Sequence, residues 1–142
     1  MEQNKKGRVL IVEDDMLLSM VEERLITKLG FDVVGKVTKA TDAIDKTTEL
    51  NPDIIIMDIS LKGEMDGIEA MEMIREKSNV PVIYLSGSSD RYYLERAKKT
   101  GFSGFLTKPV TSADLKEPLY LALKNGDKKS HPASKRQFNK TA

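Results

Sequence analysis

The sequence of 142 residues contains no cysteine and no tryptophan, and it has a single histidine, His131. Without cysteine the chain cannot form disulfide bonds, thiolate zinc sites or a cysteine nucleophile, so any nucleophile is an oxygen or a nitrogen atom. No apolar run approaches the roughly 18 residues that cross a bilayer, and the N-terminus lacks the apolar segment of a signal peptide. These absences predict a cytoplasmic location and no membrane span.

The chain also has almost no excess of positive or negative charge, because its 23 Lys and Arg residues nearly balance its 22 Asp and Glu residues and the formal net charge is +1. Residues 127–142 hold five Lys or Arg and one acid, so the rest of the chain is mildly acidic. That balance gives no sign of a nucleic-acid-binding domain, which carries a clear basic excess. The length fits one domain. We expect an N-terminal extension over residues 1–7, a folded domain over 8–126, and a basic, polar, disordered tail over 127–142.

Short apolar runs alternate along the chain with segments of helical periodicity. The expected strands cover residues 9–12, 31–37, 54–57, 82–85 and 105–106, and the expected helices cover residues 16–29, 41–50, 66–78, 90–100 and 111–126. This alternation predicts an α/β fold, a (βα)5 doubly wound parallel sheet with right-handed crossovers. The strand over 31–37 has charged neighbours and is expected at an edge, which suits the flavodoxin-like order 2-1-3-4-5.

Three local features add detail to these elements. Apolar residues recur at helical spacing over residues 16–29, and Gly30 is expected to end that helix. Asp66, with Glu69 three residues later, is expected to cap the third helix. Pro118 lies inside the fifth helix, where proline removes a backbone hydrogen bond, so we expect a kink there.

Polar side chains follow four of the apolar runs at the point where each strand ends: Glu13 and Asp14, then Asp58, then Ser86, then Lys108. The carboxyl ends of parallel strands meet at one edge of a sheet, so we expect these groups to converge. The carboxylates are ligands suited to a hard cation such as Mg2+, and Asp58 is placed as a nucleophile that would form an acyl phosphate. Lys108 adds positive charge for phosphoryl oxygens, and Ser86 adds a hydroxyl donor.

Each of these features alone is more commonly a turn or helix-capping residue. Their joint placement favours a site for phosphoryl chemistry. The segments VEDD at 12–15, IMDIS at 56–60, PVIYLS at 81–86 and GFLTKP at 104–109 resemble those of a response-regulator receiver domain of two-component signalling. The resemblance covers residues 8–126.

The resemblance implies a role for each site residue. It implies that Asp58 is phosphorylated, that Asp14 binds the metal directly, and that Glu13 contacts the metal through water. Ser60 would supply a backbone carbonyl as a further metal ligand. Ser86 would supply the switch hydroxyl, Lys108 would balance charge, and Phe105 would act as an aromatic rotamer switch. It also makes the peptide bond between Lys108 and Pro109 a candidate for the cis form.

The implied function is that of a signalling phosphoacceptor and not of an enzyme with its own substrate. The resemblance implies that Asp58 takes a phosphoryl group from a sensor histidine kinase or a phosphotransfer protein, with Mg2+ as cofactor, and that the chain then hydrolyses its own acyl phosphate. Phosphorylation would alter the face formed by the fourth helix, fifth strand and fifth helix, which would bind a downstream protein or a second copy of the chain.

Two departures from the family pattern concern partners. The loop over residues 60–67 lacks proline and has one residue more than in many receivers, and Pro118 predicts a non-standard output surface or dimer. Two readings of the whole chain stay open beside the leading one, a phosphorylation-independent receiver-like binding module and the receiver segment of a larger hybrid sensor kinase. An aspartyl-phosphate hydrolase of the same architecture would place a second aspartate where Ser60 stands.

Overall fold

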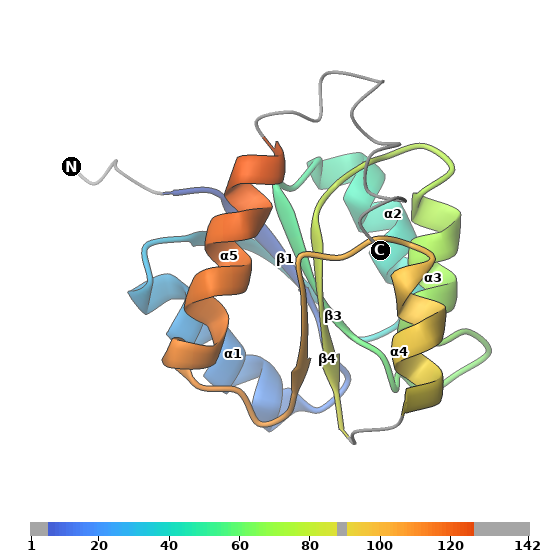
Figure 1. Cartoon of the computed structure of the whole chain (residues 1–142), viewed down its shortest axis with the longest axis horizontal. Helices are drawn as coiled ribbons and strands as arrows, with labels where there is room; N and C mark the ends of the chain where they lie inside the picture. The colour runs from blue at the N-terminus through green and yellow to red at the C-terminus, as the bar shows by residue number, and fades with distance from the viewer. Residues whose placement is uncertain (1–5, 88–90, 127–142) are drawn as a thin grey trace.

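A computed structural model describes residues 6–87 and 91–126 (Figure 1). The predicted tail and most of the predicted N-terminal extension lie outside these residues. The elements follow one another as β1 (Arg8–Val12), α1 (Met16–Lys28), β2 (Asp32–Val37), α2 (Ala40–Leu50), β3 (Ile54–Asp58), α3 (Gly67–Ile74), β4 (Val82–Ser86), α4 (Arg91–Lys98), β5 (Gly104–Thr107) and α5 (Ser112–Gly126). None of the helices within the described ranges combines the length and apolar character needed to cross a membrane.

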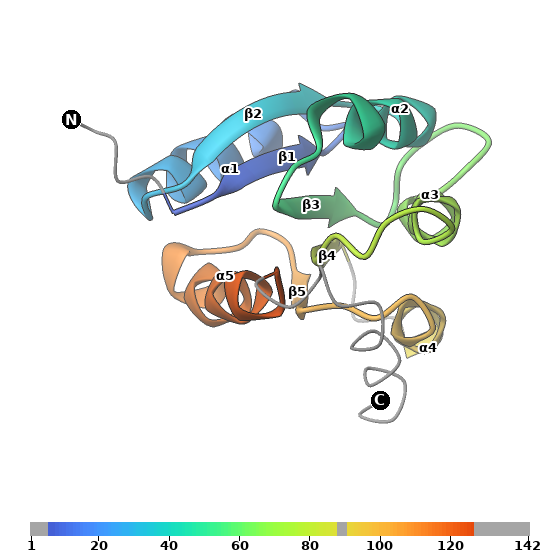
Figure 2. The same cartoon turned by 90° about the horizontal axis from the view of Figure 1, so that it is seen from above.

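The five strands form one parallel sheet in the order β2-β1-β3-β4-β5. Helices α1 and α5 cover one face, and α2, α3 and α4 cover the other, as the view from above shows (Figure 2). The predicted α/β fold and strand order are therefore confirmed, and β2 lies at an edge as expected. Because helices cover both faces of the sheet, residues 9–12, 54–57 and 82–85 of β1, β3 and β4 are apolar and buried.

Alternate residues of the strands lie in two separate hydrophobic cores, one on each face of the sheet. Val9, Ile56 and Leu85 belong to the core beneath α1 and α5, whereas Leu10, Ile55 and Tyr84 belong to the core beneath α2, α3 and α4. Successive side chains of a strand point to opposite faces, so this division follows from the strand pleat. Each core contains residues from strands that are far apart in the sequence, and this packing fixes the strand ends relative to one another.

Side-chain caps set the helix starts. Asp15 caps α1 by accepting a hydrogen bond from the Leu18 N–H at 3.0 Å. Asp66 and Glu69 form the predicted reciprocal capping box at the start of α3, with both bonds at 2.8 Å. Helix α3 ends at Ile74, earlier than predicted. The guanidinium of the next residue, Arg75, donates hydrogen bonds to the carbonyl groups of Ser78 and Val80.

Helix α1 is confirmed, but its buried stripe differs from its apolar stripe. The buried residues are Ser19, Glu22 and Ile26, spaced three and four apart. Leu17 is 69% exposed, and Val21 is exposed as well. The start of α1 is fixed by its cap directly after β1, and that phase turns the polar positions inward.

Pro118 lies inside α5, and the helix continues across it to Gly126. Its buried ring packs on β5, because a Cβ built on Gly104 would lie 2.6 Å from the Cβ of Pro118. Proline has no N–H to donate within the helix, so the expected loss of a backbone bond stands. The close contact with Gly104 gives the proline a packing role that the sequence alone does not show.

Candidate functional site

The strand ends bring the predicted site residues to one edge of the sheet. Asp58 ends β3 opposite Leu85, and Ser86 ends β4 opposite Thr107, one residue before Lys108. Glu13 and Asp14 follow β1, which pairs with β3. The side chains of Glu13, Asp58 and Ser86 are buried, so the site lies within the fold at the carboxyl end of the sheet.

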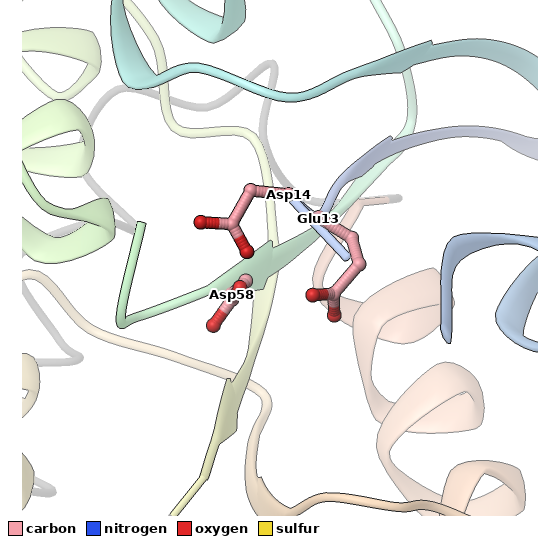
Figure 3. A group of neighbouring side chains, drawn as sticks. All are labelled: Glu13, Asp14 and Asp58. Atoms are coloured by element: carbon pink, nitrogen blue, oxygen red, sulfur yellow. The ribbon is translucent and has the colours of Figure 1, made fainter. Parts of the chain in front are cut away.

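Three carboxyl groups meet there. Glu13, Asp14 and Asp58 each offer an oxygen atom, and these atoms all lie within 4.8 Å of one another. Figure 3 shows the three groups gathered at the ends of β1 and β3. The Oδ2 atom of Asp58 is buried and has no hydrogen-bond partner among the described residues. An all-oxygen set with an unpartnered buried oxygen fits a hard divalent cation, for which carboxylate oxygens are the usual protein ligands.

Lys108 is the positive charge of the site. Its Nζ atom lies 3.2 Å from Oδ1 of Asp58 and 3.2 Å from Oε2 of Glu13, and its side chain is 12% exposed. Burial alone lowers the pKa of Lys108, but the charges of Asp58 and Glu13 outweigh that effect and raise it above the ordinary value. Lys108 is therefore held as an ammonium group bridging two carboxyl groups.

Asp58 is destabilised as an anion. Burial, followed by the charge of Glu13 and a hydrogen bond with it, raises the pKa of Asp58 from 3.8 to about 6, against the attraction of Lys108. One ammonium group thus does not balance the crowded carboxylates. A bound divalent cation would supply the missing positive charge and favour ionised Asp58.

Backbone N–H groups orient the carboxyl groups. Asp58 Oδ1 accepts a bond from the Ser60 N–H at 3.0 Å, and Asp14 Oδ2 accepts one from the Lys62 N–H at 3.1 Å. Glu13 Oε2 accepts a longer bond, 3.2 Å, from the Asp15 N–H. The loop that follows Asp58 therefore contacts two of the three carboxyl groups, and this loop is the segment in which the chain departs from the family pattern.

Ser86 ends β4 at this edge of the sheet, and Phe105 lies in the neighbouring strand β5. The carbonyl of Ser86 accepts a bond from the Lys108 N–H at 2.8 Å, which joins the ends of β4 and β5. Phe105 is half-buried, and its ring centroid lies 6.3 Å from that of Tyr84 and 5.7 Å from that of Phe102. Phe105 therefore belongs to an aromatic cluster outside the acidic group. The peptide bond between Lys108 and Pro109 is cis, as predicted.

Sequence reasoning missed Glu22 of α1. Its side chain is buried and shares a hydrogen bond with Glu13, while its Oε1 atom has no partner among the described residues. Burial, followed by the bond to Glu13 and the charge of Glu13, raises the pKa of Glu22 to about 9, so it is protonated at neutral pH. The available signal was a glutamate four residues before the buried Ile26 on the same helix face.

The chain was compared with known proteins. A family model, the response regulator receiver domain, matches residues 9–120. The chemotaxis protein CheY of Thermotoga maritima is 36% identical over 113 residues, which make up 79% of this chain and 93% of that protein. The transcriptional regulatory protein PdtaR of Mycobacterium tuberculosis is 33% identical over 116 residues, 82% of this chain and 56% of that protein.

A solved structure of a receiver domain has a similar fold. The signal receiver domain of a modulated diguanylate cyclase from Desulfovibrio desulfuricans superposes with a TM-score of 0.79 at 32% identity, covering 85% of this chain and 96% of that one. The chain belongs to the response regulator receiver domain family. Receiver domains are phosphoacceptors of two-component signalling and bind Mg2+ at an acidic pocket. The chain spans 30% of a related protein-glutamate methylesterase and 56% of PdtaR, so the activities of those whole proteins do not transfer to it.

Proposed function

We propose that Asp58 is the phosphoacceptor of a two-component phosphorelay, phosphorylated in a Mg2+-dependent reaction by a sensor histidine kinase or a phosphotransfer protein. One observation carries the proposal: Asp58 Oδ2 is buried and unpartnered among the described residues, while Oδ1 is held by Lys108 and the Ser60 N–H. That carboxylate presents one free oxygen in a site already arranged for charge balance. The proposal keeps the cytoplasmic location predicted from the sequence.

In the proposed reaction, Oδ2 of Asp58 attacks the phosphorus of a phosphohistidine. The P–O bond forms, the P–N bond breaks, and the imidazole nitrogen keeps the bonding electron pair. Glu13, Asp14 and Asp58, with the backbone carbonyl of Ser60, would hold the Mg2+ ion, which neutralises charge on the phosphoryl oxygens when bound. Lys108 lies 3.2 Å from Asp58 and supplies a second positive charge. Later attack of water on phosphorus would break the bond between phosphorus and the Asp58 oxygen, which releases inorganic phosphate and restores the Asp58 carboxylate.

The output part of the proposal concerns Ser86 and Phe105. Ser86 would donate its hydroxyl to the phosphoryl group, and Phe105 would move further inward against Tyr84. Phe105 already packs beside the buried ring of Tyr84 and the half-buried ring of Phe102, which supports a small rearrangement within existing contacts. The surface of α4, β5 and α5 would change with it and bind a downstream protein or a second copy of the chain.

A protein donor needs a surface beside the acidic group on which to dock. Met16, Leu17, Met20 and Val21, here called the α1 patch, are exposed apolar residues at helical spacing, with exposed fractions from 42% to 74%. The patch begins two residues after Asp14, at the same edge of the sheet as Asp58. We therefore assign the α1 patch to the phosphohistidine-bearing protein, whose approach to Asp58 passes over this end of α1.

The test is incubation with Mg2+ and acetyl phosphate, followed by intact-mass measurement. The wild type is expected to gain one phosphoryl group, and Asp58→Asn is expected to gain none, because an amide oxygen is not a nucleophile here. An unmodified wild type, or an adduct of equal yield on Asp58→Asn, contradicts the proposal. Such an outcome would favour the alternative, a receiver-like binding module that acts without phosphorylation.

A further inference from the structure

A two-pronged ion pair joins α4 to the start of α3. Arg96 of α4 places one terminal nitrogen 2.9 Å from Oδ2 of Asp66 and the other 3.3 Å from Oδ1. The two side chains are 22% and 24% exposed, so the pair is partly shielded from solvent. Paired N–H groups on one carboxylate give fixed geometry as well as attraction.

Asp66 is the N-cap of α3, so the pair acts on the start of the helix itself. The same carboxylate accepts the Glu69 N–H at 2.8 Å, and the Glu69 side chain accepts the Asp66 N–H. Asp66 cannot leave Arg96 without changing its own rotamer or the capping box. The ion pair therefore fixes the end of the loop that begins after Asp58.

The next residue contacts the phosphoacceptor strand directly. A Cβ atom built on Gly67 would collide with the backbone carbonyl of Asp58, and the Gly67 N–H donates to the carbonyl of Ile59 at 3.0 Å. The start of α3 thus lies against the main chain of Asp58 with no side chain between them. A displacement of the backbone at Asp58 must move Gly67, and with it Asp66.

Helix α4 buries little apolar surface, and the Arg75 guanidinium bonds the carbonyl groups of Thr100 and Gly101 just beyond its end. Within residues 92–98, Ala97 is the only buried residue, whereas α3 buries Gly67, Ile68, Ala70, Met71 and Ile74. Beyond the end of α4, Thr100 bonds the Tyr84 hydroxyl at 2.6 Å. An element with little apolar burial is positioned by its polar links. The Arg96 guanidinium also lies 5.7 Å from the ring centroid of Tyr92, which is 65% exposed on the outer surface of α4.

We propose that the Arg96–Asp66 ion pair couples the backbone at Asp58 to the position of α4, as a second route beside Ser86 and Phe105. This inference rests on the proposed phosphorylation of Asp58. Arg96 is a positioning residue, since it touches no reacting atom and acts through Asp66 and Gly67. A partner that binds around Tyr92 and shifts α4 would, by the same coupling, alter the site at Asp58.

The test uses the full chain and four variants. Arg96→Met removes the charge but keeps an apolar stem, and Asp66→Asn keeps an N-cap residue while removing the charge. The third combines both changes. Lys98→Met is the matched control, because it removes an exposed ion pair with Glu95 (3.3 Å) on the same helix. Each protein is treated with Mg2+ and acetyl phosphate, the adduct is measured by intact mass, and hydrogen exchange is followed in peptides covering 91–98.

The wild type and Lys98→Met are expected to change exchange in α4 by roughly threefold or more on phosphorylation. Arg96→Met is expected to take the same adduct but to lose about half of that response or more, and the double variant to lose no more than either single variant. An undiminished response in Arg96→Met, additive losses, or a wild type whose α4 does not respond overturns the coupling. A wild type without adduct overturns the proposed function and this inference with it. If Arg96→Met does not fold by circular dichroism, Arg96→Lys, which keeps charge without the fork, is expected to show a partial loss, and a full response overturns the coupling.

Discussion

Four carboxyl groups and one ammonium group share the carboxyl end of the sheet, and their protonation is the main residue-scale question. Glu13 contacts Lys108, the Asp15 N–H and the carboxyl group of Glu22. Two ionised carboxylates in buried contact would repel each other, so Glu22 holds a proton that Glu13 accepts in a hydrogen bond. The acidic site thus extends into α1 through a neutral acid.

The raised pKa of Glu22 leads to a prediction of how the free energy of unfolding depends on pH. Its folded-state pKa of about 9 lies above the value of 4.5 expected in the unfolded chain, so the folded state holds an extra proton between these pH values. The free energy of unfolding therefore falls as pH rises through this window, and Asp58 adds to the fall between about 4 and 6. Glu22→Gln should show a smaller fall in urea unfolding between pH 5 and pH 9 in Mg2+-free buffer.

The control for this measurement is Glu23→Gln, which changes the exposed neighbour that pairs with Lys36 at 2.7 Å. It should keep the pH dependence of the wild type, because a surface ion pair contributes little. Equal pH dependence in Glu22→Gln and the wild type would mean that Glu22 is ionised in the folded state.

Metal binding at the acidic group is expected to stabilise the folded chain. Mg2+ should raise the melting temperature of the wild type, by about 1.4 kcal/mol of unfolding free energy at tenfold excess over the dissociation constant, or a few degrees. Asp14→Ala should abolish the rise, because Asp14 supplies one of the three oxygen atoms. Asp15→Ser, which keeps the cap of α1 but removes the adjacent acid, should retain it. An equal rise in Asp14→Ala and the wild type would place the metal elsewhere.

At the scale of elements, α1 shows where sequence patterns stop being sufficient. Helical spacing predicts the helix but not its phase, because Leu17 and Val21 are apolar and exposed while Glu22 is polar and buried. The cap at Asp15 turns Glu22 inward, and its polar partner there, Glu13, lies outside the helix. The caps at Asp66 and Asp15 are local, and local signals of this kind can be predicted.

The α1 patch makes a prediction about partner recognition. Met20→Glu should change the free energy of unfolding by no more than about 0.5 kcal/mol, because Met20 is 59% exposed. It should keep the adduct from acetyl phosphate and lose most of the transfer rate from a histidine kinase that phosphorylates the wild type. Met73→Glu, on α3 at the opposite face of the sheet, is the matched control. Equal loss in both variants, or no loss in Met20→Glu, would show that the donor docks elsewhere.

For the whole molecule, the strand order and the meeting of Asp14, Asp58 and Lys108 could be predicted from the sequence. Parallel strands with short crossovers bring their carboxyl ends together, so residues at strand ends converge whatever the loops do. The links between helices could not be predicted. Whether Arg96 reaches Asp66, or Glu22 reaches Glu13, depends on helix phase and packing that no short-range pattern encodes.

Both proposals require an acyl phosphate at Asp58, and reductive trapping detects this group directly. The chain is treated with Mg2+ and acetyl phosphate, the acyl phosphate is reduced with borohydride, and the digested peptides are sequenced by mass spectrometry. We expect that residue 58 alone is converted from aspartate to homoserine, and only when the donor is present. Unchanged Asp58 in a chain that has gained a phosphoryl group, or trapping at another acid, would contradict it.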